Sequence, residues 1–137
     1  MPTLTAVDNA TTLAAMYEAF FRGDIPFIIN GLADNCTWIG AGEGALPQGG
    51  TYLGKDAQTF FARMGETTEF NEFNPVSISN INDHEVVSFG NFTITVKATG
   101  KQFSSEWVMH LKFNDEGKVV YFHDFFDTAA AYIANQQ

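Results

Sequence analysis

The sequence contains one cysteine, Cys36, and only seven lysines and arginines among its 137 residues. A lone cysteine cannot form a disulfide within the chain, so nothing points to an oxidising compartment, and we expect a cytoplasmic protein. Sixteen acidic residues give a formal net charge of −9. Such a chain repels phosphate backbones and anionic lipid headgroups, which argues against nucleic-acid and membrane partners.

Long apolar runs are also missing. No window approaches the roughly 18 apolar residues of a membrane span, and residues 1–12 lack the basic and apolar regions of a signal peptide. No repeat, low-complexity tract or linker divides the chain. The 45% apolar content, with 14 phenylalanines, is enough to fill one core. We therefore expect a single domain over residues 1–137.

The first part of the chain shows helical periodicity. Apolar side chains at helical spacing predict an amphipathic helix over residues 10–22. Asp24 is the expected N-cap of a second helix over residues 25–33, and residues 54–63 are expected to form a third. These three helices are the predicted cover for whatever apolar sheet follows.

The remaining segments favour strands and one loop. Residues 36–39 are a predicted short strand, and the glycine-rich residues 40–50 are a predicted loop that could form the lip of a site. From Phe73 the pattern has period two, which predicts sheet for most of the remaining chain. Asp127 is the expected N-cap of a final alanine-rich helix.

A turn signal predicts the register of the first hairpin. Thr99-Gly100 is typical of a two-residue turn, which would place Ala98 opposite Lys101. Continuing outward, Trp107 would lie opposite Phe92. The resulting split into one mainly apolar face and one polar face supports a sheet with a single buried side.

The next hairpin continues this apolar face. Residues 114–117 are read as a four-residue loop, which would pair Phe113 with Lys118 and Trp107 with Asp124. Asp124 would then be the only charge well inside the apolar face. A register slip of one residue would instead turn the opposite side chains of this strand inward, namely Tyr121, His123 and Phe125. Helices packed on such a sheet give an α+β fold with a ligand cavity between the layers.

Seven short segments of the sequence share their order and spacing with a known family. They are YEAFFRGD (17–24), Trp38, GTYLG (50–54), TGK (99–101), EW (106–107), GKVV (117–120) and HDFFDT (123–128). Together they resemble the nuclear transport factor two-like superfamily, in particular its SnoaL-like polyketide cyclase and ketosteroid isomerase-related branch. The resemblance implies a cone-shaped curved antiparallel sheet wrapped around the helices, an α+β barrel of cystatin-like type. It also implies an apolar pocket on the concave side and a homodimer formed through the outer sheet face.

The resemblance also shows which functional groups of the family this chain lacks. The tyrosine, base aspartate and oxyanion-hole aspartate of ketosteroid isomerases fall on Met16, near Gly40 and on Met109. The arginine and aspartate of the epoxide hydrolases belong to a strand that looks like residues 89–96, which carries no charge. The aspartate that hydrolases and cyclases have in their last strand matches Asp124. Because the fold serves many chemistries, the resemblance fixes no reaction.

Asp124 and Tyr17 are the predicted catalytic residues. Burial of the Asp124 carboxyl group among aromatic side chains would raise its pKa toward the range of a general acid or base. Alternatively, Asp124 accepts a hydrogen bond from Trp107 or a backbone amide and stays ionised. Tyr17 is the best second polar group for a ligand carbonyl. The predicted substrate pocket consists of Trp38, Phe92, Trp107, Met109 and Phe122.

The outer face of the sheet offers a weaker candidate site. His110 and His123 are expected as diagonal neighbours with Glu106 nearby, but no closed ligand shell is visible, and we predict neither a metal nor a cofactor. The apolar residues of the same face favour a symmetric dimer interface. They are Val108, Val119, Tyr121 and Phe125.

Three functions remain open from the sequence. The first is a cofactor-independent enzyme of the cyclase, isomerase, dehydratase or epoxide-hydrolase type that moves protons through Asp124. Its substrate would be a small apolar molecule bearing a carbonyl or hydroxyl group. The second is a ligand-binding module without turnover. The third is a dimeric interaction module whose pocket has no ligand.

Overall fold

The computed structural model describes residues 8–137, with helices mostly first and strands mostly afterwards. Residues 1–7 lie outside the described residues, and with them most of the stretch on which the prediction of no signal peptide rests. The helices are α1 (Asn9–Phe21), α2 (Ile25–Asn30), the 3-10 turn η1 (Gly54–Asp56), α3 (Ala57–Thr67) and α4 (Thr128–Ala134). The strands are β1 (Leu32–Gly40), β2 (Gly50–Leu53), β3 (Thr68–Asn80), β4 (Glu85–Val96), β5 (Gln102–Phe113) and β6 (Val119–Phe126).

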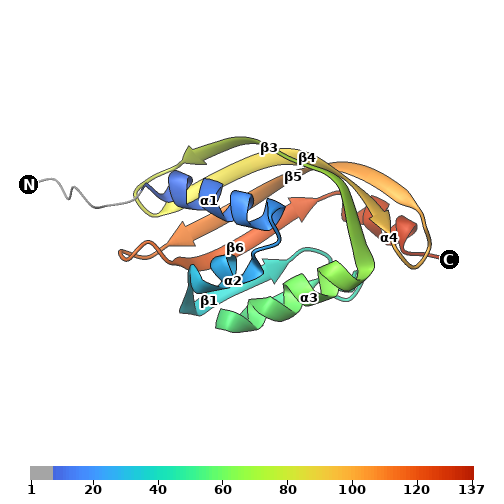
Figure 1. Ribbon diagram of the computed structural model, residues 1–137, viewed down its shortest axis with the longest axis horizontal. Coiled ribbons are helices and arrows are strands. Elements are labelled where there is room, and N and C mark those ends of the chain that lie inside the picture. Colours follow the sequence, from blue (N-terminus) through green and yellow to red (C-terminus); the bar gives the residue numbers. More distant parts are fainter. Residues whose placement is uncertain (1–7) are drawn as a thin grey trace, which may run out of the picture.

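The strands form one curved sheet in the order β2-β1-β6-β5-β4-β3, and α1, α2 and α3 lie on its concave side (Figure 1). Strand β1 pairs with β6 in parallel, whereas the other neighbours are antiparallel. Strands β2 and β3 are the two edges, so the sheet bends without closing. The predicted α+β fold, a curved sheet wrapped around three N-terminal helices, is confirmed.

Aspartate side chains begin the helices where the sequence predicts them. Asp24 accepts a hydrogen bond from the Phe27 amide at 3.2 Å, and Asp127 accepts one from the Ala130 amide at 2.9 Å. Both satisfy amides that have no partner within their helix. The two predicted caps are therefore confirmed.

Several predicted element boundaries are wrong because tertiary pairing overrides local pattern. The second helix ends at Asn30 rather than at residue 33, since Leu32 already pairs with Val119 in β6. The third begins as a 3-10 turn and continues to Thr67 instead of ending at residue 63. Strand β1 is longer than the predicted 36–39 and ends at Gly40, and the short strand β2 begins at Gly50, so both ends of the predicted loop over residues 40–50 belong to strands. Strand β3 begins at Thr68 rather than at Phe73.

The predicted register of the β4–β5 hairpin is wrong by two residues. The Val96 amide donates to the Lys101 carbonyl at 2.8 Å, and Trp107 lies opposite Gly90 instead of Phe92. A two-residue turn of the predicted type needs positive φ at both central residues, which a β-branched threonine resists. The chain instead uses a longer loop in which Gly100 alone takes positive φ, at 72°.

The β5–β6 hairpin shows a shift of the same size. The Asn114 amide donates to the Lys118 carbonyl at 2.9 Å, and a bulge follows between Lys112 and Phe113. Asp124 therefore lies opposite Met109 and not opposite Trp107 as predicted. Because both shifts are even, Asp124 keeps its predicted face. Val119 was predicted on the outer face, and that prediction is wrong: the bulge places Val119 opposite Phe113, where it is fully buried in the core. Asp124 points to the concave side, and the alternative one-residue slip is wrong.

No helix within residues 8–137 is long and apolar enough to cross a membrane.

Gly90 permits close approach of the sheet strands at the centre of β4. A Cβ atom at this position would overlap the Asn74 carbonyl oxygen of β3 and the Trp107 ring. We expect Gly90→Ala to lower the free energy of unfolding by about 1–3 kcal/mol, measured by urea denaturation. Gly65 in α3 faces open space, so Gly65→Ala is the matched control and should raise stability by about 0.5–1 kcal/mol. Equal effects at the two positions would contradict this explanation.

Candidate functional site

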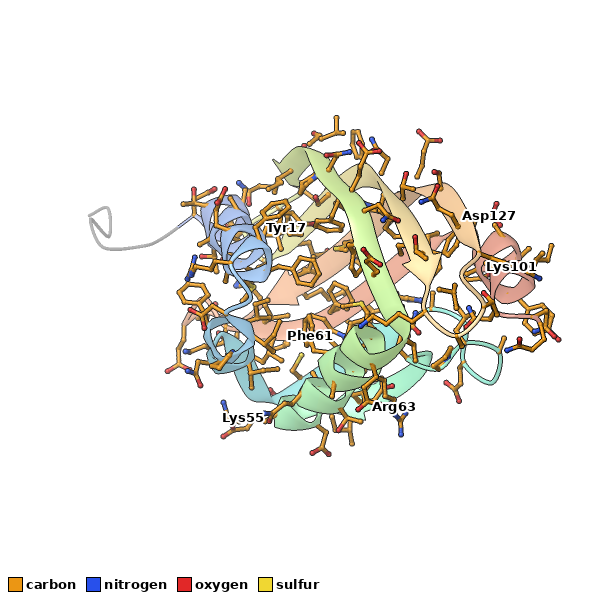
Figure 2. The ribbon with its side chains drawn as sticks, turned by 45° about the vertical axis from the view of Figure 1, so that its right-hand side comes forward. Tyr17, Lys55, Phe61, Arg63, Lys101 and Asp127 are labelled. Atoms are coloured by element: carbon orange, nitrogen blue, oxygen red, sulfur yellow. The ribbon has the colours of Figure 1, made fainter. Side chains whose placement is uncertain are left out.

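A cavity of about 110 Å³ lies between the helices and the concave face of the sheet. Figure 2 shows Tyr17 projecting from α1, and Phe61 from α3, toward this space, while Arg63 lies on the outer side of α3. Most lining side chains are aromatic, aliphatic or methionine. The polar lining residues are Tyr17, Gln48, Thr67, Thr68, Asp124 and Asn135. Such a site has the composition of a small-molecule pocket, an apolar wall with a few polar groups.

Asp124 is the one carboxylate among the described residues that line the cavity. Its exposed fraction is 9%, because β6 places it on the concave face opposite Met109. The Ala41 amide donates to Asp124 Oδ1 at 2.7 Å. Within residues 8–137, no other residue forms a hydrogen bond with Oδ2. One carboxylate oxygen is thus held by the backbone, and the other is free to meet a ligand.

Burial changes the proton affinity of this group. Desolvation raises the pKa of Asp124 from 3.8 to about 6, while hydrogen bonds from the Ala41 amide and its own amide act in the opposite direction. A carboxyl group with this pKa is mainly ionised at neutral pH, yet it can accept and return a proton near neutrality. The sequence offered two alternative hydrogen-bond donors to Asp124. The backbone amide is confirmed, in the form of Ala41, and Trp107 is wrong.

Tyr17 lies in the same cavity but is not hydrogen-bonded to Asp124. Its hydroxyl donates to Ser88 Oγ at 2.9 Å and contacts Met109 Sδ at 3.3 Å. Burial raises the pKa of Tyr17 far above its ordinary value, so the phenol stays neutral. It can serve a ligand as a hydrogen-bond donor only by turning its proton away from Ser88.

The two tryptophans have different positions. Trp38 lines the cavity and stacks on Phe122 with ring centroids 3.8 Å apart. Trp107 is buried beside Phe73, 5.1 Å between centroids, and does not line the cavity. Both indole N–H groups are buried without a hydrogen-bond partner among the described residues. Of the predicted pocket residues, the structure brings Trp38, Phe92, Met109 and Phe122 to the cavity wall and leaves Trp107 behind it.

The glycine-rich loop between β1 and β2 contributes residues to the cavity wall. The sequence predicted a loop that could form the lip of a site, but it did not identify these residues. Leu46, Pro47 and Gln48 line the cavity, and the Tyr52 hydroxyl donates to the Gln48 carbonyl at 2.8 Å. The opposite end of the loop is held by the amide of Ala41 on Asp124. The loop therefore is a lip, fixed at both ends. Glycine content marked it as irregular, but no local signal identified these contacts.

Helix α4 closes another part of the wall. Ala131 of α4 and Asn135, which follows the helix, line the cavity. The β4–β5 hairpin holds the end of the helix and the residues after it through two hydrogen bonds. Thr99 Oγ1 donates to the Ala134 carbonyl at 2.7 Å, and Lys101 Nζ donates to the Gln136 carbonyl at 2.6 Å. Figure 2 shows Lys101 and Asp127 close to this helix. The final helix is thus part of the site.

On the outer face, His110 and His123 are direct cross-strand partners and not diagonal ones as predicted. His110 Nε2 lies 2.7 Å from Glu85 Oε2, so the nearby carboxylate is Glu85 and not Glu106. Burial and the proximity of His110 lower the pKa of His123. Among residues 8–137, no group of three or more His, Cys, Asp or Glu side chains is arranged to hold a metal ion.

The cavity and fold agree with the family comparison. The family model of the SnoaL-like domain matches residues 13–122, which is most of the chain. The protein therefore belongs to the SnoaL-like family, within the nuclear transport factor two-like superfamily. The family resemblance read from the sequence is confirmed.

Solved structures share this fold over nearly their whole length. An NTF2-like protein of Burkholderia thailandensis E264 is 24% identical, with a TM-score of 0.85 over 96% of this chain and 100% of that chain. TerC, co-crystallized with polyporic acid, is 25% identical, with a TM-score of 0.78 over 93% and 98%. A candidate polyketide cyclase of Xanthomonas campestris pv. campestris is 20% identical, with a TM-score of 0.74 over 92% and 96%. No curated protein matches the chain.

The raised pKa of Asp124 makes stability depend on pH. Its folded-state pKa of about 6 exceeds the ordinary 3.8, so the folded state loses stability as pH rises from about 4 to about 6. Asp124→Asn removes this loss and can still accept the Ala41 amide. We expect the variant to exceed the wild type by on the order of 2 kcal/mol near pH 7.5 and to match it near pH 4.

Urea denaturation at several pH values measures this difference. The matched control is Asp115→Asn, which removes the same charge from an exposed turn. Among residues 8–137, the one side chain that Asp115 pairs with is the exposed His84. This control should show no comparable rise in relative stability between pH 4 and 6. A pH-independent difference for Asp124→Asn would contradict the burial argument.

Proposed function

We propose that the chain is a small-molecule-binding protein that transfers protons with Asp124, without a cofactor, on a small apolar compound bearing a carbonyl or hydroxyl group. The reaction class would be that of a cyclase, isomerase or dehydratase. The observation that carries the proposal is the carboxylate of Asp124. It lines a mainly apolar cavity, has a pKa of about 6, and has one oxygen free.

Proton abstraction next to a carbonyl needs a base close to the bound substrate. Asp124 Oδ2 is that base, since Ala41 fixes Oδ1 and thereby orients the carboxylate. Tyr17 is a neutral donor that would meet the carbonyl oxygen after leaving Ser88. The stacked rings of Trp38 and Phe122 offer a flat wall for a planar substrate.

The comparisons agree with this choice of ligand. TerC was crystallized with polyporic acid, and another neighbour in fold is a candidate polyketide cyclase. By analogy, the cavity would take a small ring compound with oxygen substituents. Three flexible methionines line the wall and allow ligands of somewhat different shape, namely Met16, Met64 and Met109.

Hydrogen–deuterium exchange into acetophenone tests the proposed chemistry. In heavy water, the wild-type protein should catalyse deuterium incorporation into the acetophenone methyl group, followed by NMR. Asp124→Asn should lower this rate by about a hundredfold or more, because the base is lost. Asp115→Asn should retain the wild-type rate.

The exchange experiment distinguishes an enzyme from a ligand-binding module without turnover. Wild-type exchange rates in Asp124→Asn would contradict a catalytic role for this residue. Saturable acetophenone binding without exchange would favour the ligand-binding module without turnover.

We also propose a homodimer through the outer sheet face. Phe89 lies opposite Val108, and Val108 lies opposite Phe125, so one apolar row crosses β4, β5 and β6. Their exposed fractions are 47%, 39% and 46%. An exposed apolar row of this kind favours self-association in a two-fold arrangement.

Val108→Asp tests the proposed dimer. A charge at the centre of the row should convert a dimer into a monomer in sedimentation equilibrium, because both copies would bury it. Ile133→Asp is the control, since Ile133 is exposed on α4 and lies outside these three strands. A monomeric wild-type protein would contradict the proposal directly.

A further inference from the structure

We propose that the cavity also binds protonated lipophilic amines, with the ammonium group paired to the free oxygen of Asp124 and enclosed by aromatic rings. The inference uses the same cavity as the proposed function, and therefore rests on its opening to small molecules. It adds a ligand class that differs from the neutral carbonyl compound by its charge.

The charge of the cavity wall is the first reason. No lysine, arginine or histidine lies among the described residues that line it. The titratable lining groups are Tyr17, which burial keeps neutral, and Asp124. When Asp124 is ionised, the cavity therefore carries one negative charge, and no described side chain in its wall balances that charge.

The geometry around the carboxylate is the second reason. Asp124 is 9% exposed, and within residues 8–137 its single hydrogen bond from another residue comes from the Ala41 amide to Oδ1. A primary ammonium group has three donors and can approach Oδ2 without breaking that bond. The pair would be charge-assisted, the stronger class of hydrogen bond.

Aromatic rings provide the third reason. Phe122 and Phe126 flank Asp124 on the concave face of β6, and both line the cavity. Trp38 stacks on Phe122, and Phe92 meets Phe126 edge to face at 5.5 Å. The faces of such rings attract cations, most strongly away from water. A carboxylate bordered by rings is thus suited to an organic ammonium ion.

Desolvation favours the cation over a neutral ligand of equal size. Folding has already removed much of the water around Asp124, which is why its pKa is raised. A neutral apolar ligand would displace further water and leave the ionised carboxylate uncompensated. An ammonium ion loses its own hydration but gains the partner that the carboxylate lacks. The overall charge of −9 also attracts cations toward the protein.

Benzylamine, benzyl alcohol and benzoate test the inference, since they share a ring and differ in charge. Binding to the full chain is measured by calorimetry at about pH 7.5 and about pH 5. At the higher pH, benzylamine should bind at least about tenfold more tightly than benzyl alcohol, and benzoate should bind most weakly. At the lower pH, the benzylamine affinity should fall by about tenfold, because protonation of Asp124, with its pKa of about 6, removes the anion.

Asp124→Asn should bind benzylamine no more tightly than benzyl alcohol, and Asp115→Asn should keep the wild-type preference. The pH comparison on the wild-type protein supplies the same information without any substitution. Equal affinity of the wild type for amine and alcohol would overturn the inference, as would a preference that survives in Asp124→Asn or binding by none of the three compounds.

The two proposals fail separately. A missing amine preference together with acetophenone exchange would overturn only the amine inference. An amine preference without exchange would contradict only the proposed proton transfer.

Discussion

The site depends on the parallel pairing of β1 with β6. This pairing places Trp38 beside Phe122, with stacked rings 3.8 Å apart, and joins the helical part of the chain to its last strand. Parallel neighbours cannot be joined by a tight turn, so the chain between them forms the rest of the sheet and α3. The pairing also brings the residue after β1, Ala41, to Asp124. Cavity wall, lip and carboxylate thus share one structural cause.

The position of Asp124 lowers the stability of the folded protein when the carboxylate is ionised. An ionised carboxylate in an apolar surrounding with one hydrogen bond from another residue lowers the stability of the fold, and its raised pKa expresses that cost. An asparagine would carry no charge here and could still accept the hydrogen bond from the Ala41 amide. The hydroxyl of Tyr17, by contrast, has its partner in Ser88. A buried carboxylate with a raised pKa and one oxygen free in a cavity has the character of a binding or reaction centre.

The sequence was sufficient for the helix caps and for the face of Asp124, but not for the registers, the bulge that buries Val119, or the long-range contacts. Alternation of period two placed Asp124 inside, and an error of two residues left that result unchanged. The register of the β4–β5 hairpin depends on its loop. The β-branched Thr99 disfavours the predicted two-residue turn, so the loop is longer than the sequence predicts. Trp107 and Phe122 both occupy inward-facing positions in the alternation of their strands. Trp107 nevertheless lies behind the cavity wall, because Phe73 covers it. The contact of Ala41 with Asp124 joins residues far apart in the chain, so periodicity could not reveal it.

The two proposed ligand classes make opposite demands on one group. A neutral carbonyl compound uses Asp124 as a base, and a site filled by an apolar ligand raises the pKa of the carboxylate further, which strengthens that base. An ammonium ion instead stabilises the ionised form and lowers the pKa, so the carboxylate becomes a counterion and loses its function as a base. A bound amine would therefore inhibit proton transfer through charge as well as by occupying space. The free oxygen of Asp124 is the common requirement, and the charge of the ligand decides which role that oxygen takes.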